Sequence, residues 1–185
     1  MPMTRQPEPA TLSEGVAPDP ANPRPYRDAL GRYATGVAVV TAREAGGGGP
    51  LGITVNSFAS VSLDPPLVLW SAARASLRHA HFSVAGAFAI HVLAADQAEL
   101  ATRFSRNGAD FAGIPFTLSD LGVPLLANTL ARFECVAETR HEGGDHTIIL
   151  GRVIRFASGP LAAPLVFAQG GYGQLHPLDP ASGTR

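Results

Sequence analysis

Short polar side chains interrupt an apolar segment that runs from Leu51 to Ser71. Thr54, Asn56 and Ser57 stand among core-type residues, and buried amides or hydroxyls cost free energy unless they are paired. Asparagine offers both a donor and an acceptor, and hydroxyl groups rotate to serve as either. The segment therefore indicates a β-hairpin that binds a polar, planar molecule, although a polar sheet edge or an ordinary β-bulge would use the same residue types.

A second polar group follows this segment, between Ser71 and Arg78. A helix beginning near Ser76 would present unpaired backbone N–H groups and the positive end of its dipole to an anion. Arg74 and Arg78 would add positive charge beside that helix end. The group predicts a phosphate site, and the alternative is a simple N-cap with a solvated arginine.

A third candidate is the turn Gly144-Asp145-His146-Thr147. Glycine lets a turn approach a ligand closely, and Asp145 can cap the turn or orient the imidazole of His146. Judged from the residues alone, a histidine that only closes a turn is the simpler interpretation.

These candidates need a frame of short strands to hold them. Composition and periodicity predict an amphipathic helix from about Tyr26, a second helix beginning near Ser76, and a third from Gln97 to Ser105 with Asp96 as its cap. Strands are expected at 37–41, 51–58, 67–70, 88–93, 131–141, 147–157 and 165–168, with an irregular excursion at 107–128 and a closing segment at 170–173. Hairpins connect most neighbours, so we expect an antiparallel barrel with a few flanking helices.

Composition excludes several classes of protein. The net charge of −1 and the scattered basic residues argue against nucleic-acid binding. No apolar run approaches the ~18 residues of a membrane span, and the first residues lack the apolar core of a secretory signal, so we expect a cytoplasmic protein with no membrane contact. The histidines show no metal-ligand spacing, so no metal is predicted, and Cys135 fits a buried structural thiol.

The string Thr54-Val55-Asn56-Ser57, followed by Ser60 and Asp64-Pro65-Pro66, resembles the signature of the flavin reductase family. The turn Gly144-Asp145-His146-Thr147 and the ending Gly170-Gly171-Tyr172 are also similar to that family, although Gln169 stands where many members have a charged residue. The resemblance implies a mainly β fold, the FMN-binding split β-barrel of antiparallel Greek-key type. It covers residues 26–175, between an N-terminal tail at 1–25, expected to be disordered, and a C-terminal tail at 176–185.

The implied activity is reduction of free FMN or FAD by NADH, or less often NADPH, in a homodimer. The reduced flavin would then diffuse to a separate flavin-dependent monooxygenase or halogenase. The resemblance assigns His146 to the nicotinamide or to the reactive face of the flavin. It implies cofactor contacts from Thr35, Gly36, Thr54, Val55, Asn56, Ser57, Ser60, Ser71, Arg74, Ser76, Arg78, Asp145 and Tyr172.

Two alternatives belong to other functional classes. One is a flavin-binding electron carrier or store without rapid turnover of NAD(P)H. The other keeps the split barrel but changes its chemistry to pyridoxamine phosphate oxidation or haem handling, against which the Thr54–Ser57 segment and the lack of a basic phosphate cluster both argue.

Overall fold

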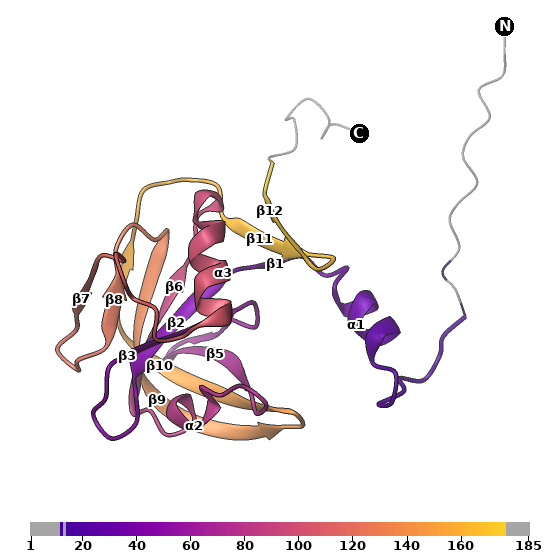
Figure 1. Ribbon diagram of the computed structural model, residues 1–185, viewed down its shortest axis with the longest axis horizontal. Coiled ribbons are helices and arrows are strands. Elements are labelled where there is room, and N and C mark those ends of the chain that lie inside the picture. Colours follow the sequence, from indigo (N-terminus) through magenta and orange to yellow (C-terminus); the bar gives the residue numbers. More distant parts are fainter. Residues whose placement is uncertain (1–11, 13, 177–185) are drawn as a thin grey trace, which may run out of the picture.

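The fold is built on one seven-stranded antiparallel sheet (Figure 1). The structure is a computed structural model that describes residues 12 and 14–176. The strand order is β3-β2-β6-β9-β10-β5-β4, and a connection of only three residues, 56–58, joins the edge strands β3 and β4. This short connection brings the two edges of the sheet together as a barrel. The strands are β2 (Ala38–Arg43), β3 (Pro50–Val55), β4 (Ala59–Leu63), β5 (Pro66–Ala73), β6 (Ala87–Val92), β9 (Ala131–Gly143) and β10 (His146–Ser158). The expected mainly β architecture is confirmed.

Two smaller sheets flank the barrel. One has the order β1-β11-β12, formed by Thr35–Gly36, Leu165–Ala168 and Gly171–Gln174. The other is a hairpin of β7 (Phe116–Leu118) and β8 (Pro124–Leu126). The segment 107–128, expected to be irregular, thus contains a hairpin, and the expected closing segment at 170–173 is largely a strand. The sequence did not predict either element as a strand, because both segments are rich in glycine or proline, which are rare in strands.

The core explains why β2 is apolar at successive positions from Ala38 to Val40. Val40 faces the barrel interior, where Trp70 lies edge-on to Phe82 and Phe88, with ring centroids 5.2 and 6.0 Å apart. Val39, on the opposite face of β2, packs in a second cluster under the helix α3 (Ala98–Arg106). A strand buried on both faces needs apolar residues at every position rather than at alternate ones.

His91 is a buried core residue that links three strands. Its Nδ1–H donates to the carbonyl of Val39 over 3.1 Å, and its Nε2 accepts the N–H of Leu126 over 3.0 Å. Burial is the main reason that the pKa of His91 falls from 6.5 to about 3. Because both ring nitrogens are satisfied only in the neutral form, His91 is a structural residue of the fold.

The helix expected to begin near Ser76 is much shorter in the structure. Strand β5 continues to Ala73 because it pairs with β10 as far as His146, and turns then lead to α2, which covers only His79–Phe82. The Ser76 hydroxyl accepts the N–H of Arg78 over 3.3 Å within those turns. The prediction of a helix N-terminus at Ser76 is wrong, because strand pairing and local turn bonds take those residues.

Helix α3 lies within one residue of its expected bounds, but its cap differs. A single 3₁₀ turn, η1 (Ala95–Gln97), precedes it and includes Asp96. The Gln97 side chain, not that of Asp96, bonds back to the N–H of Ala94 over 2.9 Å. Helix α3 then packs tightly on β3, since a Cβ on Gly52 would lie only 2.5 Å from the ring of Phe104.

The first helix, α1 (Arg24–Leu30), projects away from the barrel (Figure 1). It contains no buried residue, and its side chains Tyr26 and Leu30 are 51% and 56% exposed. A backbone bond of 2.7 Å from Gln169 N–H to the carbonyl of Gly31 ties its end to the β11–β12 turn. The helix begins two residues before the expected start at Tyr26.

Residues 1–11 and 13 of the expected N-terminal tail, and residues 177–185 of the expected C-terminal tail, lie outside the described residues. Within the part of the chain that the structure describes, no helix is long and apolar enough to cross a membrane. The same residues contain no cluster of three metal-ligating side chains.

Candidate functional site

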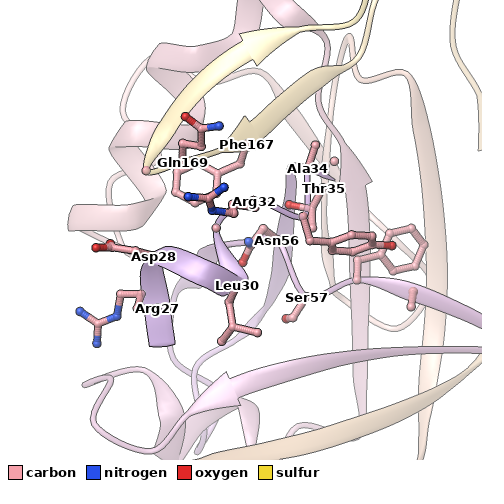
Figure 2. A pocket seen from close by; sticks show the side chains of 16 residues that line it. Arg27, Asp28, Leu30, Arg32, Ala34, Thr35, Asn56, Ser57, Phe167 and Gln169 are labelled. Carbon is pink, nitrogen blue, oxygen red and sulfur yellow. The ribbon is translucent and has the colours of Figure 1, made fainter. Parts of the chain in front are cut away.

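A cavity of about 980 Å³ opens between α1, the segment that follows β3, and the β11–β12 turn (Figure 2). It lies where the two edges of the barrel sheet meet, so three elements that are distant in sequence contribute to its wall. Its lining residues are Arg27, Asp28, Leu30, Gly31, Arg32, Tyr33, Ala34, Thr35, Gly36, Asn56, Ser57, Phe58, Ala59, Phe167, Gln169 and Gly170. Four of the predicted contacts, Thr35, Gly36, Asn56 and Ser57, are therefore brought together here.

Ser57, in the connection between β3 and β4, is hydrogen-bonded to strand β5. Its hydroxyl accepts the N–H of Ser71 over 3.0 Å and lies 3.4 Å from the carbonyl of the same residue. Ser71 sits within β5, opposite Ile148 of β10. The two predicted serines thus bond to each other, and Ser57 also lines the cavity.

Asn56 and Thr35 offer polar groups that the protein leaves free. Asn56 is exposed on the cavity wall just after β3 ends. The Thr35 hydroxyl is buried and has no hydrogen-bond partner among the described residues. An unpaired buried hydroxyl costs about 1–3 kcal/mol, so a ligand that pairs with it gains affinity. The donors and acceptors present fit the carbonyl and nitrogen edge of a heteroaromatic ring.

Thr54 and Val55 do not line this cavity. The Thr54 hydroxyl donates to the carbonyl of Ala101 in α3 over 2.6 Å, and Val55 packs in the barrel core. Strand alternation ends with β3 at Val55, so it does not place Asn56 on the same face as Thr54. The hydroxyl of Thr54 is committed to holding α3.

The two arginines of the predicted phosphate site between Ser71 and Arg78 already have partners within the protein. The Arg78 guanidinium donates to the carbonyls of Phe104 and Ser105, at 2.5 and 3.0 Å, and burial lowers its pKa. Arg74 instead pairs with Glu142 over 2.8 Å. No helix begins at Ser76, and none of these residues lines the cavity, so the phosphate site stays a prediction.

His146 lies at the β9–β10 hairpin turn, outside the cavity lining. Gly144 opens this two-residue turn with a φ of +69°, a conformation that favours glycine. His146 Nδ1 and Asp145 Oδ1 are 2.7 Å apart, and this hydrogen bond is the main reason that the pKa of Asp145 is lowered. The bond fixes the imidazole orientation with Nδ1–H as the donor and leaves Nε2 for a ligand.

Two further predicted contacts lie near the cavity without lining it. Ser60 is exposed on β4, opposite Val68 of β5. Tyr172 on β12 pairs with Phe167, and their rings meet edge-on with centroids 5.7 Å apart. Since Phe167 lines the cavity, Tyr172 contacts the cavity wall through the Phe167 ring.

Sequence reasoning missed the contribution of α1 and of the β11–β12 turn. Arg27 and Arg32 line the cavity on the α1 side, and Gln169 lines it from the turn. The hydrogen bond between Gln169 and Gly31 joins residues near opposite ends of the domain sequence, and no local sequence pattern predicts it. The available signal was two arginines in the short segment just before Thr35, one within α1 and one just after its end.

Comparisons with known proteins agree with this architecture. Residues 30–176 match the model of the flavin reductase like domain. The chain is 54% identical over 158 residues to FMN reductase (NADH) SmoA of Agrobacterium fabrum, covering 85% of this chain and 89% of the relative. It is 39% identical to HsaB of Rhodococcus jostii, the reductase subunit of a flavin-dependent monooxygenase, over 88% of this chain and 83% of the relative.

A solved structure gives a similar result. The NADH:FAD oxidoreductase SgcE6 of Streptomyces globisporus C-1027, in complex with NAD and FAD fragments, superposes with a TM-score of 0.79 at 35% identity. The match covers 88% of this chain and 98% of that one. Some relatives are longer, since the chain spans 48% of a 45% identical probable flavin reductase from Rhizobium meliloti.

Proposed function

Since this chain belongs to the flavin reductase like domain family and reduces free flavin with NAD(P)H, we propose that the cavity beside Asn56 binds the flavin ring. The observation that carries this assignment is the exposed amide side chain of Asn56 on the cavity wall. The unpartnered hydroxyl of Thr35 lies beside it, and a volume of about 980 Å³ lies at the upper end of the usual range for ligand sites, roughly 300–1,000 Å³.

The flavin, FMN or FAD, supplies the hydride acceptor, and the protein supplies binding and orientation. Asn56 would bond the polar edge of the ring, while Phe58 and Phe167 form apolar parts of the wall. Burial of the ring against these side chains excludes water from the reacting face. Holding donor and acceptor in a fixed geometry is how such a site accelerates transfer, because the entropy of alignment is lost on binding.

His146 would position the nicotinamide. Its imidazole is fixed through Nδ1 by Asp145 and offers Nε2 to a donor group such as the carboxamide of NADH. This role needs orientation rather than proton transfer, since hydride transfer is chemistry of the two cofactors. Residues 26–175 would form the catalytic domain, with Tyr172 supporting the cavity through Phe167.

We also propose a homodimer that completes the cavity. Leu30 and Tyr33 both line it, yet they are 56% and 79% exposed, and α1 buries no residue within one subunit. Phe156 on β10 is similarly 70% exposed. Large apolar side chains that remain open to water favour association, so a second subunit packed over α1 would shield the flavin.

The product leaves the protein. Related reductase subunits serve two-component oxygenases and halogenases, and this chain likewise supplies reduced flavin to a separate enzyme. We propose that this partner is reached by diffusion of flavin and that both proteins are cytoplasmic, where reduced nicotinamide is available.

NADH oxidation with added free flavin tests the activity. The loss of nicotinamide absorbance should be followed for FMN and FAD, each with NADH and NADPH, with the purified protein alone. A matched pair of variants, Thr35→Ser and Thr35→Val, then tests the ring site, since only the first keeps a hydroxyl. We expect Thr35→Val to bind flavin about tenfold more weakly, equivalent to one lost hydrogen bond, and Thr35→Ser to bind nearly normally. Inactivity with every flavin and both nicotinamides would refute the enzyme assignment.

A further inference from the structure

The turn between β9 and β10, which carries His146, is held in place by the segment that follows β5. The backbone N–H of Arg74 donates to the carbonyl of Asp145 over 2.9 Å, which extends the pairing of β5 and β10 beyond Ala73. The Arg74 guanidinium also pairs with Glu142, near the end of β9, over 2.8 Å. Because the Glu142 side chain is 90% exposed, this ion pair is weak, and the backbone bond is the stronger restraint of the two.

A third contact reaches this turn from α2, which lies against the β9–β10 hairpin (Figure 1). His79 Nε2 and the hydroxyl oxygen of Thr147 are 2.9 Å apart and form a hydrogen bond. Thr147 is only 8% exposed, and His79 is half-buried. A hydrogen bond that is shielded from water is stronger than an exposed ion pair, so His79 provides the firmest side-chain restraint on the turn.

Helix α2 is short, but it is anchored in the barrel core. Phe82 lies three residues after His79, so the two side chains share one face of the helix. Phe82 is 1% exposed and meets Trp70 edge-on, with ring centroids 5.2 Å apart. Burial of this phenyl ring fixes α2 on the barrel and thereby fixes the position of the His79 imidazole.

Thr147 and His146 are neighbours on β10, so their side chains point to opposite faces of the sheet. Thr147 shares its face with Ile149, which is buried in the barrel core. A bond that fixes the Thr147 side chain on this inner face therefore fixes the backbone from which His146 projects on the opposite face. Asp145 orients the imidazole ring of His146, whereas His79 determines where its Cα lies.

We propose that His79 is a positioning residue for hydride transfer, which acts through Thr147 on His146. Because His146 positions the nicotinamide only under the proposed function, this role of His79 rests on that assignment. Without the bond to Thr147, the start of β10 can shift, and misplacement near 1 Å of a group that aligns donor and acceptor can cost on the order of a hundredfold in rate. Neither His79 nor Thr147 lines the cavity, so flavin affinity should not change.

Matched variants on both sides of the bond test the proposal. His79→Leu and Thr147→Val each remove the bond at similar side-chain size, whereas His79→Gln and Thr147→Ser keep a hydrogen-bonding group. Anaerobic stopped-flow reduction at increasing NADH concentration gives the limiting rate and the NADH dependence, and fluorescence titration gives flavin affinity. We expect the Leu and Val variants to reduce flavin about tenfold more slowly, the equivalent of one lost hydrogen bond, and the Gln and Ser variants to stay within about twofold of the unmodified protein. All four should bind flavin normally.

His81→Leu is the control on the same helix. The Nδ1 atom of His81 accepts the N–H of Ala45 over 3.0 Å, in the loop between β2 and β3. This variant removes an equivalent histidine hydrogen bond that does not reach the β9–β10 turn, so it should reduce flavin at the normal rate. An equal loss of rate in His81→Leu and His79→Leu would overturn the proposal, since loosening of α2 alone would explain both.

The His146→Ala background separates the role of His79 from that of His146. If His79 acts through His146, His79→Leu should slow reduction no further once the His146 imidazole is gone. Equal slowing in both backgrounds, weaker flavin binding, or normal reduction by both His79→Leu and Thr147→Val would overturn the proposal. If His79→Leu fails to fold, Thr147→Val in the same two backgrounds decides. Normal reduction by His146→Ala alone would refute the proposed role of His146, and the positioning role of His79 would fall with it.

Discussion

His91 should make the folded protein sensitive to acid. Its pKa is about 3 in the folded state against 6.5 for an unperturbed histidine, so between these values the unfolded chain binds a proton that the folded protein does not. The contribution of neutral His91 to the free energy of unfolding is therefore fully present above pH 6.5 and is lost as the pH falls toward about 3. One pKa unit corresponds to about 1.4 kcal/mol, so this residue alone should remove about 2.7 kcal/mol between pH 7.5 and pH 4.5.

The measurement is the free energy of unfolding in urea, determined at several pH values for the unmodified protein and for His91→Gln. Other groups titrate in both proteins, so the difference between the two curves isolates His91. The variant loses part of the bonding to Val39 and Leu126, so it should be less stable at pH 7.5, and this deficit should shrink by about 2.7 kcal/mol at pH 4.5. A constant deficit for His91→Gln across this range would refute the buried neutral imidazole.

Three further predictions concern the site and the tail. Asn56→Ala should weaken flavin binding by about 1–3 kcal/mol in a fluorescence titration, and unchanged affinity in a folded variant would move the ring elsewhere. His146→Ala should keep normal flavin affinity but slow anaerobic stopped-flow reduction by NADH, by up to about a hundredfold if the donor is misplaced by about 1 Å. A reduction rate equal to that of the unmodified protein would limit His146 to closing its turn. Deletion of residues 1–20 should leave the melting temperature and activity nearly unaltered, because a proline-rich segment with few apolar groups buries little.

The sequence predicted the strands well because their patterns are local. The bounds of β11 match the expectation, and β9 and β10 differ from it by two residues or fewer at each end. Apolar and β-branched runs report directly which residues a sheet buries. The prediction of a helix beginning near Ser76 was wrong, although the residues there are compatible with a helix. Pairing between β5 and β10, which are distant in sequence, extends the strand to Ala73 instead.

The candidate site was only partly visible for the same reason. Asn56 and Ser57 could be found because polar residues stand out in an apolar strand. Thr54 looked equivalent, but α3 takes its hydroxyl, and the partner atom lies 47 residues away along the chain. The sequence likewise suggested Arg78 as a phosphate ligand, but its guanidinium donates to a carbonyl near the C-terminus of α3. Tertiary contacts decide which polar group stays free for a ligand. A pattern of residues along the sequence does not contain those contacts.

The attachment of α3 divides the protein into parts of different mobility. The Thr54 hydroxyl, the Arg78 guanidinium and the close packing of Phe104 over Gly52 all fasten this helix to β3 or its surroundings. Backbone amides in α3 and β3 should therefore exchange their hydrogens through one shared opening event, as a single cooperative unit. Helix α1, with no buried residue, should open independently and at far lower cost. Within one subunit, one wall of the cavity is then rigid and the wall formed by α1 is the part that yields, so packing of a second subunit over α1 would also be expected to slow hydrogen exchange in that helix.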